Sequence, residues 1–179
     1  MIHVRSVTQD IINKDKFDLR PLVASDQAMI DLYAGDERVA HNTSRIAHPL
    51  PPGHTEAFIK RAQSADRFED IWAIDASKDG GPSLTGIISL SRMDRNQSEI
   101  GYWVAPAFWN TGIASGAVEA LIEANPQGCE TIFACVFQDN PASARVLTNQ
   151  GFEYIGDAET FCVARNTNVA TWTYICKLS

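Results

Sequence analysis

The stretch that decides the fold runs from Glu99 to Glu123 and reads EIGYWVAPAFWNTGIASGAVEALIE. Its first six residues are rich in β-branched and aromatic side chains, and Pro106 ends the run, so this part is predicted to be a strand. From Gly112 onward, apolar residues recur every three or four positions, which is the period of an α-helix. Asn110 and Thr111 are both residue types that cap helices. The stretch is therefore predicted to fold as strand, short loop and helix.

The loop between this strand and this helix has the composition of an anion site. The first N–H groups of a helix have no partner within it, and the helix dipole places about half a positive charge there. The loop has no Lys or Arg, and four residues are small enough to let a phosphate approach the backbone: Gly112, Ala114, Ser115 and Gly116. From spacing alone, the segment is either a phosphate site held by backbone donors or a plain helix start packed against a sheet.

A second strand and helix follow. Residues 131–137 are predicted to be a strand, and Asn140 with Pro141 is a strong signal for a helix start. Gly151 is typical of a helix end.

Together these segments resemble the GNAT N-acetyltransferases, most closely the RimJ/RimL-type branch. That branch carries Glu-Ile-Gly-Tyr-Trp, then Pro-x-x-Trp-x-x-Gly-x-Ala, then Asn-x-x-Ser-x-x-Val-Leu-x-x-x-Gly-Phe. The matching residues here are Glu99 to Trp103, Pro106, Trp109, Gly112, Ala114, Asn140, Ser143, Val146, Leu147, Gly151 and Phe152. The resemblance runs from Phe17 to the C-terminus. It implies an α/β GNAT fold, with a mixed, mostly antiparallel central sheet flanked by helices.

The length of 179 residues fits a single domain over 1–179, and 45% hydrophobic and 21% charged residues are ordinary for a soluble protein. Residues 1–16 have no clear pattern and are interpreted as an extra strand or an N-terminal extension. No apolar run approaches the roughly 18 residues of a membrane span, and residues 1–10 are too polar for a signal peptide. We therefore expect a cytoplasmic protein with no membrane partner.

The net charge of −7 argues against a nucleic-acid partner. It mildly favours cationic amines, although a charge of this size also simply keeps a small domain soluble. The four cysteines form no Cys-x-x-Cys pair and have no His at zinc-finger spacing, so they are interpreted as structural and no metal is expected; they are Cys129, Cys135, Cys162 and Cys176.

The rest of the chain is predicted to alternate strands with short helices. Strands are expected at 17–22, 71–76, 84–90 and 98–104, the last three as an antiparallel meander, and near the C-terminus at 152–155, 161–164 and 171–178. Helices are expected from Ser25 or Asp26 to 34, briefly after Asp36, and from a Thr55 cap to 64. His41, His48 and His54 could face a substrate, although isolated loop histidines are more often solvated.

The resemblance implies acetyl-CoA as the donor. It places the pyrophosphate on the backbone of residues 110–114, which are Asn110, Thr111, Gly112, Ile113 and Ala114. The pantetheine arm is expected near Trp103, Val104 and Asn140, although Asn140 also serves as a helix cap. The chain departs from the family because Asn110 and Thr111 stand where Gly and Arg or Lys are common, and Gly116 where Glu is common. Losing one exposed charge costs roughly 1 kcal/mol or less.

The implied reaction needs a base for the acceptor ammonium and a proton source for the departing thiolate. Glu99 is the candidate base, directly or through water; alternatively, it merely begins a strand. Many GNAT enzymes carry a Tyr seven residues after the Asn, but that position is Leu147 here. Ser143 is then the candidate hydrogen-bond donor or relay to the thiolate, or else a structural residue of the first helical turn.

The resemblance implies direct transfer in a ternary complex, with a protein N-terminus or a small amine as acceptor and a monomer or homodimer as the assembly. Two alternatives stay open. One is a non-catalytic acyl-CoA-binding or regulatory domain, and the other is a transferase that uses another acyl-CoA, such as succinyl-CoA.

Overall fold

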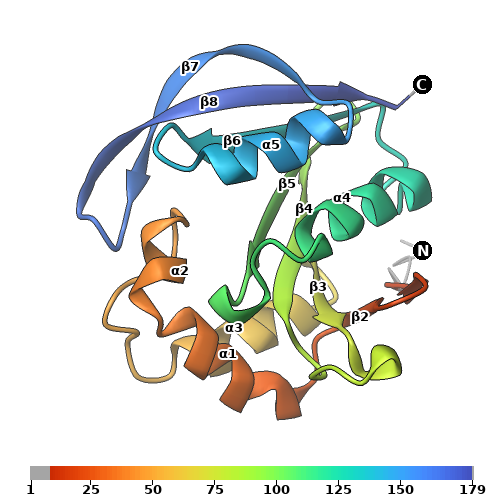
Figure 1. Ribbon diagram of the computed structural model, residues 1–179, viewed down its shortest axis with the longest axis vertical. Coiled ribbons are helices and arrows are strands. Elements are labelled where there is room, and N and C mark those ends of the chain that lie inside the picture. Colours follow the sequence, from red (N-terminus) through yellow and green to blue (C-terminus); the bar gives the residue numbers. More distant parts are fainter. Residues whose placement is uncertain (1–8, 179) are drawn as a thin grey trace, which may run out of the picture.

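An eight-stranded sheet forms the centre of the computed structural model, which describes residues 9–178 (Figure 1). Its order is β1-β2-β3-β4-β5-β6-β8-β7, and every neighbouring pair is antiparallel except β5 and β6. This mixed, mostly antiparallel sheet with flanking helices confirms the predicted fold class. The strands are β1 Ile12–Asn13, β2 Asp18–Pro21, β3 Glu69–Asp75, β4 Gly86–Met93, β5 Gln97–Val104, β6 Thr131–Phe137, β7 Glu153–Cys162 and β8 Thr167–Lys177. The helices are α1 Gln27–Ala34, α2 Glu37–His41, α3 His54–Gln63, α4 Ile113–Ala124 and α5 Pro141–Asn149.

Two hydrophobic cores lie on opposite faces of this sheet, because successive strand residues point to opposite sides. Helices α4 and α5 cover one face, where Trp72 and Ile88 pack with Leu121. Helices α1 and α3 cover the other face, where Ile71 packs with Ile30. Figure 1 shows α1, α2 and α3 grouped at one end of the molecule, and β7 and β8 arching over β6 and α5 at the other.

Strands β5 and β6 run parallel but pair over only three residues. Gln97–Glu99 pairs with Thr131–Phe133, and the ladder between the two strands contains no further pair. Strand β5 nevertheless continues to Val104, and β6 continues to Phe137. The strands therefore separate beyond Glu99, and Figure 1 shows β5 turning away from β6. Beyond Glu99 and Phe133, the facing backbone edges of β5 and β6 are not paired with each other.

The predicted meander of β3, β4 and β5 is confirmed, as are the strand at 131–137, the helical turn after Asp36 and the Asn140 helix cap. The Asn140 side chain accepts a hydrogen bond from the backbone N–H of Ser143 (3.4 Å). The expected Thr55 cap is wrong. Helix α3 begins at His54, with Gly53 (φ +77°) in the cap position two residues before Thr55, and the Thr55 hydroxyl is buried without a hydrogen-bond partner among the described residues.

The caps expected at the start of α4 are also wrong. Gly112 occupies the cap position with φ +82°, and no side chain caps the helix. The Thr111 hydroxyl instead donates to the carbonyl of Phe108, and Asn110 itself adopts φ +59°. Two left-handed residues in the loop, Asn110 and Gly112, thus replace a side-chain cap, and the first N–H groups of α4 stay open.

Three strands were predicted near the C-terminus, but the structure has two long ones, β7 and β8. Residues 161–164 are the end of β7 and the start of its turn into β8, and residues 156–160 belong to β7 itself. Strand β7 lies at the sheet edge and is exposed along most of its length, so it lacks the apolar alternation that marks a half-buried strand.

Of the N-terminal residues 1–16, the first eight lie outside the described residues. Residues 9–16 include the edge strand β1, which pairs with β2, and they also contact α4. The Trp72 indole donates to the carbonyl of Asp10 (3.2 Å), and the Lys14 ammonium pairs with Glu119 (3.2 Å) and Glu123 (3.1 Å) of α4. Between residues 9 and 178, no helix is long and apolar enough to cross a membrane.

Candidate active site

Two cavities meet at the gap between β5 and β6. The first, of about 550 Å³, lies against the start of α4 and the side of α5, and we call it the α4 cavity. The second, of about 640 Å³, lies between α3 and the face of β3, β4 and β5, and we call it the α3 cavity. The residues that line both are Asn42, Ile100, Gly101, Tyr102, Trp103, Cys135 and Phe137. The two cavities therefore adjoin each other at the separated strands.

The α4 cavity brings together every residue predicted to bind the cofactor. Those residues are Trp103, Val104, Asn110, Thr111, Gly112, Ile113, Ala114, Asn140 and Ser143. A Cβ atom added to Gly112 would meet nothing within 4 Å, so the approach to the helix start is open. An uncapped helix start beside open space is suited to a phosphate, because its N–H groups are free to donate. Gly116 is different: an added Cβ would come within 3.0 Å of the Phe17 ring, so packing explains its small size.

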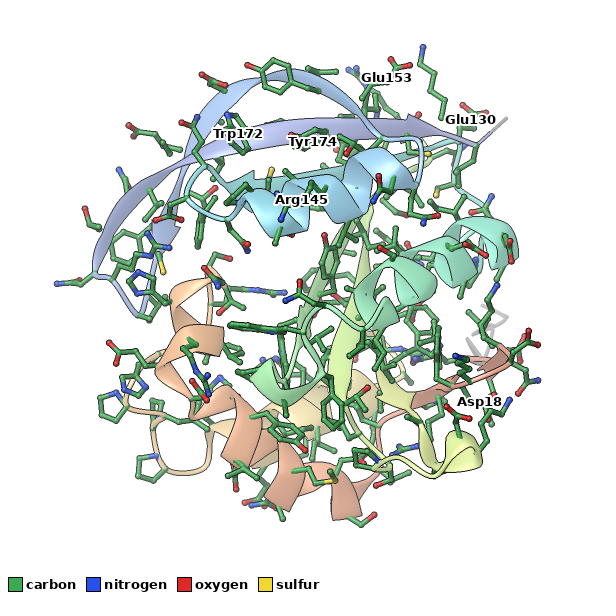
Figure 2. All side chains as sticks on the ribbon, in the orientation of Figure 1. Asp18, Glu130, Arg145, Glu153, Trp172 and Tyr174 are labelled. Carbon is green, nitrogen blue, oxygen red and sulfur yellow. The ribbon has the colours of Figure 1, made fainter. Side chains whose placement is uncertain are left out.

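Two arginines supply the positive charge that the loop lacks. Arg38 of α2 and Arg145 of α5 both line the α4 cavity. The Arg38 guanidinium lies 5.8 Å from the centre of the Trp109 ring and pairs with Asp36 (2.7 Å). Arg145 forms no ion pair with the described residues, and Figure 2 shows it on α5. Sequence reasoning missed both because they come from outside the loop, although Arg145 lies only two residues beyond Ser143 on α5.

Tyr102 is the other residue that sequence reasoning missed. Its hydroxyl lies 2.8 Å from the Ser143 hydroxyl and 3.2 Å from the Ser143 carbonyl. Burial raises the pKa of Tyr102 to about 12, so the phenol stays protonated near neutral pH. The alternation of side chains along β5 could have indicated this position, because it turns Tyr102 toward α5 and Glu99 toward the opposite face.

The floor of the α3 cavity is built from matched rows across the strands. Glu69 lies opposite Ser91, and Ser91 lies opposite Glu99, so these residues form one row on one face. The two carboxylates are two strand spacings apart along that row, or about 10 Å. Ser89 and Gly101 form part of the next row, and the absent side chain at Gly101 leaves the floor hollow beside Glu99.

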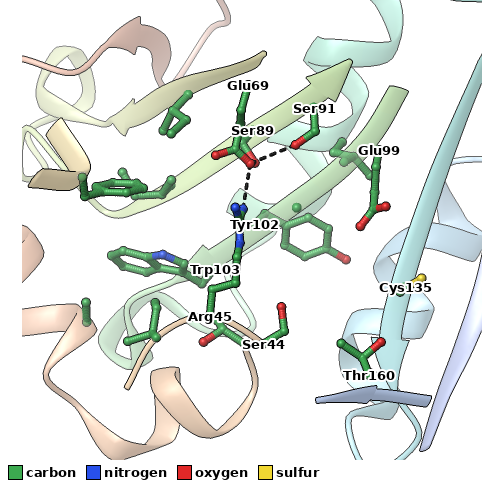
Figure 3. Close-up of a pocket in the computed structure, with 18 of the residues that line it drawn as sticks. Ser44, Arg45, Glu69, Ser89, Ser91, Glu99, Tyr102, Trp103, Cys135 and Thr160 are labelled. Carbon is green, nitrogen blue, oxygen red and sulfur yellow. Dashed lines mark hydrogen bonds and ion pairs between the residues drawn. The ribbon is translucent and has the colours of Figure 1, made fainter. Parts of the chain in front are cut away.

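The two carboxylates of this row have different surroundings. Glu69 accepts hydrogen bonds from Ser91 (2.9 Å) and Ser89 (3.3 Å). It also forms an ion pair with Arg45 (2.7 Å; Figure 3). Glu99 has no hydrogen-bond partner among the described side chains. Partial burial raises its pKa, the positive charge of Arg45 opposes the rise, and the negative charge of Glu69 adds to it. Glu99 is thus a carboxylate of raised pKa, and it lies at the point where the gap begins.

Of the three histidines considered as substrate contacts, one lines a cavity and two do not. His54 lines the α3 cavity and stacks on Phe58 with ring centres 6.5 Å apart. Burial lowers its pKa, so the imidazole is neutral at pH 7. His41 and His48 line neither cavity.

The uncapped start of α4 thus lies on one side of the split sheet, and the Glu99 carboxylate lies on the other. The model of the acetyltransferase (GNAT) domain matches residues 16–153, and the chain belongs to this family. It is a GNAT-type N-acetyltransferase, as predicted.

The chain is 25% identical over 173 residues to the uncharacterized N-acetyltransferase YoaA of Bacillus subtilis, covering 92% of this chain and 94% of that protein. Among solved structures, it resembles the microcin C7 self-immunity acetyltransferase MccE in complex with acetyl-CoA and AMP (TM-score 0.79, 16% identity, 92% and 93% of the two chains). It also resembles RimL, a ribosomal L7/L12 alpha-N-protein acetyltransferase, in complex with coenzyme A (TM-score 0.75, 17% identity, 95% and 100% of the two chains). At these identities the two structures support the fold alone.

Proposed function

We propose that the protein transfers an acetyl group from acetyl-CoA to a primary amine by direct attack within a ternary complex. The observation that carries this proposal is the junction of the two cavities at the gap between β5 and β6. A donor held at the start of α4 and an acceptor on the opposite face can meet only there. Glu99 stands at the edge of that junction on the acceptor side, and Ser143 stands on the donor side.

The α4 cavity is the proposed donor site. The open N–H groups at the start of α4 would hold the pyrophosphate, with Arg38 and Arg145 adding charge. The exposed edges of β5 and β6 beyond Glu99 would receive the pantetheine arm beside Asn140. Acetyl-CoA, when bound, supplies the thioester carbonyl that the amine attacks.

Glu99 is the proposed base. An acceptor amine enters as an ammonium ion and must lose a proton before its nitrogen can form the new C–N bond. Because the pKa of Glu99 is raised, its carboxylate binds a proton more readily than that of an ordinary glutamate. The proton passes to the carboxylate directly or through one water in the α3 cavity.

Ser143 and Tyr102 are the proposed donors to the departing thiolate. Serine alone is a poor acid. The single hydrogen of the Tyr102 phenol is within reach of both the carbonyl (3.2 Å) and the hydroxyl (2.8 Å) of Ser143, and when it is donated to the hydroxyl, the serine hydrogen is free to point into the α4 cavity. The tyrosine that many family members carry on the helix is therefore replaced here by one that reaches Ser143 from β5.

Removing either hydroxyl should lower turnover more than it lowers donor affinity. We expect Ser143→Ala to lower kcat by about 10- to 100-fold and Tyr102→Phe by about tenfold, each with less than threefold change in the Kd for acetyl-CoA. The double variant should be no slower than Ser143→Ala, because the phenol acts through the serine. Steady-state kinetics and calorimetry measure the two quantities, and fully additive losses would contradict the relay.

Both a protein N-terminus and a small amine are candidate acceptors. RimL is named for acetylating a protein α-amino group, and the α3 cavity is also large enough for a small amine. We further propose a cytoplasmic location, because all four cysteines are free thiols.

The test is calorimetric titration with acetyl-CoA, followed by thiol release with a panel of amines and N-terminal peptides. Binding with amine-dependent thiol release would support the proposal. Binding without release from any amine would contradict acetyl transfer and favour a binding module. Thiol release with succinyl-CoA but not with acetyl-CoA would contradict the choice of donor.

A further inference from the structure

Arg45 projects into the α3 cavity from the segment that joins α2 to α3. One of its terminal nitrogens pairs with Glu69 at 2.7 Å, and Figure 3 shows the side chain extending from its segment toward Glu69. The side chain is 69% exposed, whereas that of Glu69 is only 12% exposed. A guanidinium carries five N–H donors, and only one is used among the described residues. The remaining donors face a cavity that must receive the acceptor.

The segment that carries Arg45 is held in place by the hairpin of β7 and β8. The backbone N–H of Val163 donates to the carbonyl of Ser44 (3.0 Å), and the Cys162 thiol donates to the carbonyl of Thr43 (3.1 Å). Arg165 also donates to the carbonyl of His41 (3.0 Å). Arg45 is therefore anchored at both its backbone and its tip, which lowers the entropy lost when it binds a ligand.

The other cations of this cavity are already engaged. Arg92 pairs with the buried Asp70 (2.8 Å), and the Arg61 guanidinium lies 5.8 Å from the centre of the Phe58 ring. Glu69 is engaged as well, because three donors converge on one of its oxygens. A second ammonium group on the acceptor would have to displace Arg45 from Glu69, whereas an anionic group could pair with Arg45 as it stands.

We propose that the acceptor is a primary amine that carries a carboxylate or phosphate group close to the amine, and that Arg45 binds this anionic group. The inference rests on the proposed function and names the substrate class of the same site. The ammonium would face Glu99, and the anion would face Arg45, whose charge is near enough to affect Glu99. Ile71, Ile87 and Phe58 line the remainder of the cavity, so an apolar side chain on the acceptor is also accommodated. This selectivity would be local, since the chain as a whole carries a charge of −7.

The experiment compares matched acceptors that differ only in the anionic group. The pairs are leucine with leucinamide, phenylalanine with phenylalaninamide, and phosphoethanolamine with ethanolamine, each tested at saturating acetyl-CoA by thiol release. We expect kcat/KM to be at least tenfold higher for one or more of the anionic members. The first two pairs detect carboxylate recognition, and the third detects phosphate recognition.

The variants are Arg45→Gln, Arg45→Lys and, as a matched control, Arg61→Gln. Arg45→Gln should remove the preference for the anion by about 10- to 100-fold, Arg45→Lys should retain part of it, and Arg61→Gln should leave it unchanged. Arg45 also influences Glu99, so absolute rates will change for every acceptor. The ratio within each pair cancels that effect and isolates the contact with the anion.

Three outcomes would overturn the inference. Turnover of amines without any preference for the anionic members would refute it and leave acetyl transfer standing. A preference that survives in Arg45→Gln would refute the role of Arg45. Failure to release thiol with any amine in any pair or panel would refute the proposed function and the inference with it.

Discussion

Aspartate in place of Gly112 should lower the affinity for acetyl-CoA by about a hundredfold or more, or abolish binding within the range that calorimetry measures. Gly112 stands at the start of α4 with φ +82°, and space is open around the position of its missing Cβ. A carboxylate there would project beside the N–H groups proposed to hold the pyrophosphate. It would both repel the phosphates and accept hydrogen bonds from the same donors, as a normal helix cap does.

Gly112→Asn is the matched control. Asparagine has the same shape, carries no charge, and tolerates a left-handed backbone better than most residues. We expect it to weaken binding by about tenfold or less, so the difference between the two variants measures the charge alone. Equal affinities in wild type and Gly112→Asp, with both proteins folded by circular dichroism, would place the phosphates elsewhere.

Glu99→Gln should lower kcat/KM at pH 7 by about 10²- to 10⁴-fold, since it removes the general base. In the wild type, kcat/KM should fall as the pH drops through the raised pKa of Glu99, above the range of an ordinary glutamate. In the variant this limb should vanish. The residual rate should then rise with pH as the acceptor amine loses its own proton in solution.

The stability of the same variant provides the control. A carboxylate whose pKa is raised in the folded state loses stability when it ionises, so rising pH destabilises the wild type between its unfolded and folded pKa values. Glutamine has no charge to desolvate, and Glu99→Gln should be at least as stable as the wild type at pH 7. A pH–rate profile identical to that of the wild type would remove Glu99 as the base.

Much of the fold could be predicted because its local signals agree with its packing. The meander of β3, β4 and β5 has apolar alternation bounded by turn residues, and α5 has both a cap at Asn140 and a stop at Gly151. The sequence pattern predicted two short strands in place of β7, because an edge strand exposed on both sides does not need apolar residues at alternate positions. Gly112 was not recognised as the cap, because glycine at this position acts through its backbone rather than through a side chain.

The site was predictable only where its residues are close in sequence. The cofactor residues between 103 and 114 lie in one continuous stretch from the end of β5 to the start of α4, and Ser143 follows Asn140 within one helical turn. Arg45 and Glu69 could not be predicted as site residues, since their proximity to Glu99 depends on strand register and on how the segment before α3 crosses the sheet. Tyr102 is an intermediate case. Its place on the predicted strand followed from the sequence, but its contact with Ser143 depends on where α5 packs against the sheet.

The central claim is that acetyl-CoA occupies the gap between β5 and β6, and Cys135 provides a direct probe of it. Cys135 lines both cavities and is exposed, whereas Cys129, Cys162 and Cys176 are buried. Its rate of alkylation by a maleimide can be followed by mass spectrometry, with Cys135→Ser as the control for site identity. Saturating acetyl-CoA, at a concentration set by calorimetry, should slow this alkylation by at least tenfold. An alkylation rate that saturating acetyl-CoA leaves unchanged would contradict the placement of the donor in the gap.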